Sequence, residues 1–91
     1  ISTLEIENNL DKHADILESC ACGIPDEKFG EIVGALIYAT KKIDEDEIKD
    51  FLSKTLATYK IPEIIKFTDK PLPRIASEKI DRVGIKDILS S

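Results

Sequence analysis

The sequence predicts an α+β fold, in which a small three-stranded mixed sheet is covered by helices. Two observations predict it. Apolar residues recur at helical spacing in three segments and follow strand patterns in three others, and the order is helix, strand, strand, helix, strand, loop, helix. Two strands joined by a turn pair antiparallel, whereas a third strand reached through a helix can pair parallel. The sheet is therefore expected to be mixed.

The first predicted helix covers residues 3–13. Ser2 and Glu5 have the spacing of a capping box, because the Ser2 side chain can accept a hydrogen bond from the backbone near Glu5. Apolar residues then recur on one helical stripe, which consists of Ile6, Leu10 and Ala14.

Two strands follow this helix. Residues 16–23 alternate, so that Glu18, Cys20 and Cys22 share one face of a short strand. Residues 23–26, Gly-Ile-Pro-Asp, are typical of a turn. Residues 31–40 are almost continuously apolar, which favours a strand covered on both faces. We expect this second strand in the middle of the sheet.

The second predicted helix begins at Asp44, which can cap the backbone of Glu47 three residues later. Ile43 and Ile48 flank the cap with the spacing of a hydrophobic staple. The buried stripe of this helix is expected to consist of Ile48, Phe51, Leu52 and Leu56. Its acidic residues between positions 44 and 50 are expected to form a solvated face.

The last two elements follow Pro62. Residues 64–68 form the third predicted strand, and Asp81 can cap a last helix. Gly84 is a weak point early in that helix. The apolar residues at helical spacing there are Ile85, Ile88 and Leu89.

Composition excludes several classes of function. The chain has 91 residues, enough for one domain over residues 1–91, and a formal net charge of -5. This charge argues against general attraction to nucleic acid or to an anionic membrane. No apolar run approaches the roughly 18 to 20 residues that span a bilayer, and no signal-peptide pattern opens the chain. We expect a soluble, cytoplasmic domain without a membrane span or a nucleic-acid partner.

The cysteine and histidine content argues against a metal site. Cys20 and Cys22 are one residue apart in an apolar stretch, and His13 is the only histidine, so the ligand count of a structural zinc site is not reached. We expect two buried, reduced thiols, consistent with a reducing cytoplasm.

The chain also lacks the motifs of a complete nucleotide enzyme. It contains no Gly-x-x-x-x-Gly-Lys-Ser/Thr and no Gly-x-Gly-x-x-Gly phosphate loop. Its first residue is not methionine and falls inside a helix-start signal, so we expect a fragment of a larger protein. What it can supply is one placed cation. Pro71 and Pro73 stiffen the loop before the last helix, so the loop is expected to be held open and to project Lys79 from the body.

This loop resembles the terminal proline-arginine-threonine-x-x-glycine-lysine-x-x-arginine signature of adenylate-forming enzymes. Here it reads Pro73-Arg74-Ile75-Ala76-Ser77-Glu78-Lys79-Ile80-Asp81-Arg82, with Glu78 in place of the family glycine. Three more segments match in the family's order: Glu5-Ile6-Glu7, the run from Gly23 to Glu31, and Tyr59-Lys60-Ile61-Pro62. The resemblance covers essentially the whole chain and is greatest to acyl-CoA synthetases, or fatty-acid–CoA ligases.

The resemblance implies a C-terminal lid domain with Lys79 as its catalytic residue. In this family a large N-terminal domain of the same chain binds ATP and a small carboxylic acid, which react to acyl-adenylate and pyrophosphate. The small domain closes over that site, and its lysine bridges the carboxylate and phosphate oxygens. It then rotates so that coenzyme A can take the acyl group. Acylation of this lysine often switches such enzymes off, which makes Lys79 a candidate for that modification.

The same resemblance makes ATP and coenzyme A co-substrates of the full enzyme, with Mg²⁺ expected beside them. The isolated fragment is expected to bind none of them and to be inactive. Two alternatives stay open: the lid of an adenylation domain that loads a carrier protein, and a free-standing protein-interaction module.

The other residues of the matching segments are expected to be structural. Gly30 and Glu31 are interpreted as turn and strand-entry residues. Tyr59 and Lys60 are expected to pack and to close the end of the second helix, because cations favour helix C-termini. Glu5 and Glu7 are interpreted as charges of the first helix.

Overall fold

The computed structural model describes residues 2–91. The elements in chain order are α1 (Thr3–Leu10), β1 (Glu18–Asp26), β2 (Gly30–Tyr38), α2 (Glu45–Ser53), the short 3₁₀ helix η1 (Thr58–Lys60), β3 (Ile64–Thr68) and α3 (Arg82–Ser90). The predicted order is confirmed, with η1 added between α2 and β3.

The three strands form one mixed sheet with β2 in the middle. β2 pairs antiparallel with β1, where Ala21 lies opposite Ala35, and parallel with β3, where Ala35 lies beside Ile65. Both the mixed sheet and the central place of the apolar strand are therefore confirmed.

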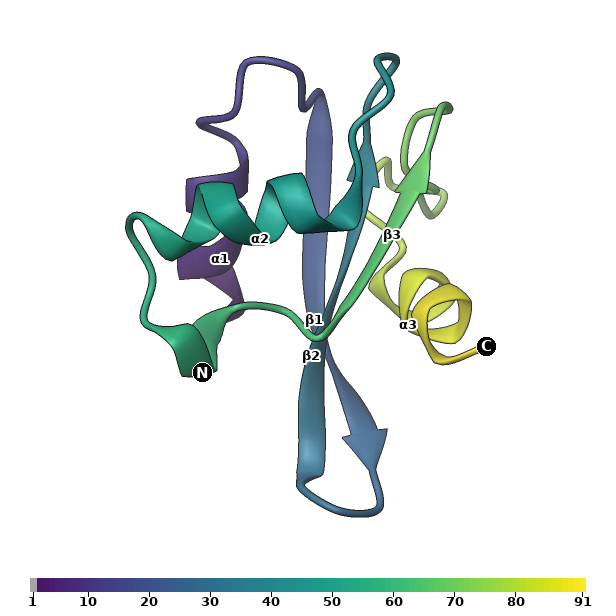
Figure 1. Ribbon diagram of the computed structural model, residues 1–91. Helices are drawn as coiled ribbons and strands as arrows, with labels where there is room; N and C mark the ends of the chain where they lie inside the picture. The colour runs from purple at the N-terminus through teal and green to yellow at the C-terminus, as the bar shows by residue number, and fades with distance from the viewer. Residues whose placement is uncertain (1) are drawn as a thin grey trace.

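Helices cover both faces of this sheet. α1 and α2 lie on one side and α3 on the other, while the β1–β2 hairpin extends beyond them (Figure 1). Successive residues of β2 alternate between the two cores: Ala35 and Ile37 belong to the α1 and α2 side, and Leu36 belongs to the α3 side. This burial on both faces explains why the β2 sequence shows no polar alternation.

Each of the three α-helices begins at the residue that the capping patterns predict. Ser2 Oγ accepts a hydrogen bond at 3.2 Å from the amide three residues later. Asp44 Oδ1 accepts the equivalent bond at 2.8 Å, and Asp81 Oδ1 at 2.9 Å. Each cap satisfies a backbone donor that the helix itself leaves without a partner.

The end of the first helix was wrong in the prediction. α1 ends at Leu10, not at residue 13, and Ala14 is exposed instead of continuing the stripe. The amide of His13 donates to Leu10 O at 3.0 Å, which closes a tight turn. This turn brings Ile16 into the core at the start of the sheet. The chain therefore leaves the helix at Leu10 and buries Ile16, and the predicted last turn of the helix does not form.

The first strand is longer than predicted and shifts the turn that follows it. β1 continues through residues 23–26, and the hairpin turns at residues 27–29. Pro25 is tolerated because β1 is an edge strand, where one side needs no backbone donor. Asp26 Oδ2 accepts bonds from the amides of Lys28 at 3.1 Å and Phe29 at 2.8 Å, and Gly30 supplies the positive φ of 80°.

The predicted helical stripes are nearly correct. In α2, Ile48 and Leu52 are fully buried and Phe51 is partly buried, while Leu56 is buried beyond the end of the helix. In α3 the stripe is narrower than predicted, because Ile88 remains 41% exposed.

Candidate functional site

Lys79 lies on a small hairpin between β3 and α3. Arg74 and Ile80 form an antiparallel bridge at its base. Beyond them the Ile75 amide donates to Lys79 O at 2.9 Å, and the Glu78 amide donates to Ile75 O at 2.8 Å. We call residues 73–81 the Lys79 hairpin. Its backbone is closed by its own hydrogen bonds.

This closure differs from the predicted open loop. Pro71 and Pro73 do precede the turn, but Pro73 O accepts a bond from the Asp81 amide at 2.9 Å and draws the two ends together. The lysine is therefore presented by a hydrogen-bonded turn as well as by stiff prolines.

Glu78 occupies the position at which the family signature has glycine. The backbone conformation of Glu78 explains why the signature has glycine there. Glu78 has φ of 68°, and it is the only non-glycine residue with positive φ within residues 2–91. A three-residue hairpin turn of this kind places its last residue in the left-handed region. Glycine adopts that region without cost, whereas other L-residues pay about 1 to 2 kcal/mol.

Lys79 is exposed and forms no ion pair in the part of the chain that the structure describes. It borders an open hollow of about 640 Å³ that is lined by Arg74, Ile75, Lys79, Ile80, Asp81, Arg82 and Val83. Ile75 is 49% and Val83 is 75% exposed. An ammonium group without an ion-pair partner, next to exposed apolar side chains, can bind an anionic group of a ligand that also has an apolar portion.

The N-terminal side of the Lys79 hairpin is anchored to β1 by Glu18. One carboxylate oxygen, Oε1, accepts a bond from the Leu72 amide at 3.0 Å, and the other, Oε2, pairs with the Arg74 guanidinium. Arg74 Nη1 also donates to Glu78 O at 3.1 Å. The guanidinium therefore connects β1 to the far side of the hairpin turn.

The C-terminal side is anchored by a second ion pair. Arg82 donates from Nη1 to Glu7 Oε2 at 3.0 Å and from Nη2 to Glu7 Oε1 at 3.3 Å. Glu7 Oε2 also accepts from the Ala21 amide at 2.8 Å, and Arg82 Nη1 lies 3.3 Å from Ala21 O. Glu7 is only 8% exposed. This pair fastens α1, the edge of β1 and the start of α3 together.

Burial keeps the two cysteines next to this pair protonated near pH 7. Burial raises the pKa of Cys20 to about 11, although Arg82 nearby partly opposes the shift. Burial also raises the pKa of the Cys22 thiol. The hydrogen bonds that Arg82 donates to Glu7 raise the pKa of Arg82 above its ordinary value. Both cysteines are free, as predicted, but the prediction that both are buried was wrong for Cys22, which is only partly buried.

The remaining matching segments are structural, with three corrections. Lys60 Nζ pairs with Glu5 Oε1 at 3.0 Å and joins η1 to α1, so the prediction that Lys60 closes the end of the second helix was wrong. Tyr59 is 72% exposed, so its predicted packing was wrong. Glu7 was predicted to be an ordinary helix charge, which was also wrong, because its side chain is buried and pairs with Arg82.

In the matching segment of residues 23–31, a close contact between Gly23 and the Glu31 side chain explains why position 23 is glycine. A Cβ on Gly23 would lie 2.4 Å from the side-chain carboxyl carbon of Glu31, so a larger residue at position 23 would displace that side chain. Gly30 supplies the turn and Glu31 enters β2, as predicted.

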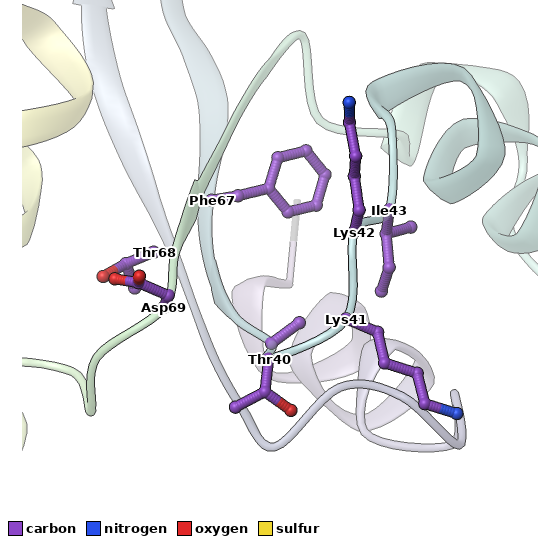
Figure 2. Close-up of a pocket in the computed structure, with 8 residues that line it drawn as sticks. Thr40, Lys41, Lys42, Ile43, Phe67, Thr68 and Asp69 are labelled. Atoms are coloured by element: carbon purple, nitrogen blue, oxygen red, sulfur yellow. The ribbon is translucent and has the colours of Figure 1, made fainter.

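A second hollow, of about 460 Å³, lies where β2 leads into α2, beside the end of β3 (Figure 2). Phe67 faces Lys42 across it, and the ammonium groups of Lys41 and Lys42 point away from each other. Lys41 is paired with Asp15 at 3.3 Å. The two lysines therefore do not converge on one anion, and Lys79 does not line this hollow.

Within residues 2–91 no three side chains among His, Cys, Asp and Glu converge to hold a metal ion. In the same residues no helix has the length and apolar content to cross a membrane. The arrangement that offers chemistry is therefore the exposed ammonium of Lys79 on its anchored hairpin.

Sequence reasoning singled out Lys79 and missed one carboxylate that holds its hairpin. Glu18 lies outside all four matching segments. The sequence signal for Glu18 is its charge, because it shares a strand face with Cys20 and Cys22, and that face is otherwise apolar.

Residues 5–79 match the AMP-binding enzyme C-terminal domain family. The chain is 40% identical over 84 residues to an oxalate–CoA ligase of Saccharomyces cerevisiae, which covers 90% of this chain and 15% of the ligase. It is 39% identical over 83 residues to a 2-succinylbenzoate–CoA ligase of Listeria monocytogenes, which covers 91% of this chain and 18% of that protein. This chain thus spans less than one fifth of the length of both relatives.

The fold is also similar to part of a larger solved structure. A Mycobacterium tuberculosis fatty acyl CoA synthetase superposes with a TM-score of 0.83 at 31% identity, over 94% of this chain and 17% of the synthetase.

Proposed function

The chain belongs to the family of AMP-binding enzyme C-terminal domains, and on this premise we propose that it is the C-terminal lid of an AMP-forming acyl-CoA synthetase. Residues 1–91 would form one domain of a longer polypeptide. The large N-terminal domain of that polypeptide would supply the pockets for ATP and for the carboxylic acid.

The proposed reaction has two steps. A carboxylate oxygen of the acid attacks the α-phosphorus of ATP, the bond to the bridging oxygen breaks, and pyrophosphate leaves with that electron pair. The thiol of coenzyme A then loses its proton, its sulfur attacks the acyl carbon, and AMP leaves. The products are an acyl thioester, AMP and pyrophosphate.

Lys79 would act in the first step. The carboxylate and the α-phosphate are both negative and repel each other, so an ammonium between them favours their approach and offsets charge in the transition state. The observation that carries this proposal is the exposed Lys79, which forms no ion pair within residues 2–91 and sits on a hairpin anchored at both ends. A cation already paired within the domain would have to break that pair first.

ATP, coenzyme A and Mg²⁺ belong to the full enzyme in this proposal. Lys79 is the residue of this chain that would contact phosphate oxygens, and the ligands of Mg²⁺ are expected in the large domain. Mg²⁺ would neutralise part of the phosphate charge when it is bound.

The acyl substrate is proposed only as a small-molecule carboxylic acid. The names of the relatives span oxalate, 2-succinylbenzoate and fatty acyl groups, so fatty acids are one class among several. We propose a cytoplasmic location for the enzyme, which would agree with the free thiols of Cys20 and Cys22.

The test compares the full-length enzyme with its Lys79→Ala variant in the two half-reactions. Acyl-adenylate formation, followed by pyrophosphate release, should fall by about a hundredfold or more, the usual effect of losing a transition-state donor. Thioester formation from supplied acyl-adenylate should largely survive. The matched control is Lys42→Ala, which removes an exposed lysine from the other hollow. Equal loss in both half-reactions, or no loss, would contradict the role of Lys79.

The isolated 91-residue chain is expected to be inactive, because most contacts to ATP lie outside it. It should show no exchange of pyrophosphate into ATP above the buffer blank. Measurable exchange by the chain alone would contradict the lid assignment.

A further inference from the structure

We propose that Glu18 is a positioning residue for Lys79. The inference rests on the proposed function and deepens it, because it states how the lysine is held for the adenylation step. Glu18 is the first residue of β1 and lies outside the four signature segments.

The Lys79 hairpin has little packing of its own. Residues 73–79 are all exposed, and at its base Leu72 is buried and Ile80 is partly buried. The tip of the hairpin therefore takes its position from polar contacts with the rest of the domain.

Glu18 supplies such contacts on the N-terminal side. Its carboxylate holds the backbone at Leu72 through a bond of 3.0 Å and the side chain at Arg74 through an ion pair. The two contacts are two residues apart, so together they fix both the position and the direction of this strand of the hairpin.

Arg74 extends this hold to the lysine. Its Nη1 donates at 3.1 Å to Glu78 O, the carbonyl of the peptide bond that joins Glu78 to Lys79. The contacts thus run from the Glu18 carboxylate through one guanidinium to the peptide immediately before the lysine. Loss of the carboxylate would free that guanidinium and the peptide plane with it.

The two carboxylates that anchor the hairpin differ in burial. The Glu18 side chain is 24% exposed and the Glu7 side chain is 11% exposed, while both arginine partners are exposed, Arg74 to 42% and Arg82 to 54%. A partly exposed pair adds little to stability. Replacing Glu18 with glutamine is therefore expected to have little effect on folding. The expected effect is that the Lys79 hairpin is no longer held in place.

The first experiment uses the Glu18→Gln variant of the full-length enzyme. The amide oxygen can still accept from the Leu72 amide, but the charge that holds Arg74 is gone. We expect the rate of acyl-adenylate formation at saturating substrate to fall about tenfold to a hundredfold, as for a small misplacement of a reacting group. Thioester formation from supplied acyl-adenylate should keep its rate. Glu45→Gln is the matched control, because Glu45 pairs with Lys49 at 3.0 Å on α2, remote from the hairpin in the fold.

A second measurement reads the hairpin without substrates. Limited trypsin digestion followed by mass spectrometry should show faster cleavage after Lys79 in Glu18→Gln than in the unaltered enzyme or in Glu45→Gln. Cleavage after Arg74, which lies in the same hairpin and loses its ion pair, should also be faster. Cleavage at lysines and arginines outside residues 73–81 should be unchanged. Faster cleavage everywhere would indicate general destabilisation and would overturn the positioning role.

The double variant Glu18→Gln/Lys79→Ala separates this inference from the proposed function. If Glu18 acts only through Lys79, the double variant is as slow as Lys79→Ala alone. Losses that multiply would overturn the inference. If Lys79→Ala slows adenylate formation and Glu18→Gln does not, the inference fails while the proposed function stands. If Lys79→Ala has no effect, the proposed function fails, and the inference fails with it.

Discussion

Glu78 occupies a backbone conformation that glycine would adopt at lower cost. Glu78→Gly should relieve about 1 to 2 kcal/mol of left-handed strain and lose about 0.5 to 1 kcal/mol to the added freedom of the unfolded chain. The net expectation is a small stabilisation, measured as a higher urea midpoint of the chain. Ser77→Gly is the matched control, because φ of Ser77 is not positive, and it should destabilise. A lower midpoint for Glu78→Gly would contradict the explanation.

The thiol of Cys20 gives a pH prediction at the same scale. Its pKa is raised to about 11 in the folded protein from 9.0 in the unfolded chain. Between these values the unfolded state binds fewer protons, so the free energy of unfolding falls as the pH rises from about 9 to about 11. The loss is on the order of 2 kcal/mol.

The measurement for Cys20 is urea unfolding at several pH values. Cys20→Ala should flatten the decline in this window, whereas the neighbouring Ser19→Ala variant should keep it. An unchanged slope in Cys20→Ala would mean that other groups carry the pH dependence.

At the scale of the elements, the beginnings of the helices could be predicted and some of their ends could not. A cap such as Asp44 acts on residues three positions away, so its signal is contained in the local sequence. The end of α1 at Leu10 and the extension of β1 to Asp26 depend on what the sheet can bury and on which strand is at its edge. Those partners are distant in sequence, and a local pattern cannot report them.

The cap of α2 is the element whose loss is simplest to test. Asp44→Ala removes the acceptor for the Glu47 amide at 2.8 Å and should cost about 1 kcal/mol in the free energy of unfolding. Asp44→Asn is the control, because its side-chain oxygen can still accept from the Glu47 amide while the charge is removed, so it should cost clearly less than Asp44→Ala. Equal costs would show that charge, not capping, matters at Asp44.

At the scale of the whole molecule, ion pairs connect the signature segments to one another. Lys60 pairs with Glu5, and Arg82 pairs with Glu7, so the first helix contacts two segments that are far away in sequence. These ion pairs explain why the segments that contain Glu5, Glu7 and Lys60 occur together with the segment of Lys79, although they contain no catalytic residue. They also show that Glu7 is part of the core rather than a surface charge.

Removal of Glu7 should therefore affect the whole fold. Glu7→Ala leaves the Ala21 amide and the Arg82 guanidinium without their partner, and we expect a loss of about 2 to 3 kcal/mol. Glu7→Gln should lose less, since its amide oxygen can still accept from Ala21. Glu5→Ala breaks a more exposed pair and should cost less than about 1 kcal/mol. Similar losses in both alanine variants would contradict the central role of Glu7.

The sequence by itself determined the fold class, the order of the elements, the helix caps and the candidate lysine. Each of these depends on residues close together in the chain or on a motif with a fixed spacing. Only the tertiary structure decided that the loop of Lys79 is a closed hairpin, that Glu78 is strained and that Glu18 and Glu7 hold the hairpin at its two ends. The anchoring contacts join residues 56 and 75 positions apart, and they exist only once the sheet and its helices have packed together. The closure of the hairpin is local, but its hydrogen bonds are made by backbone groups, which the pattern of side chains does not report.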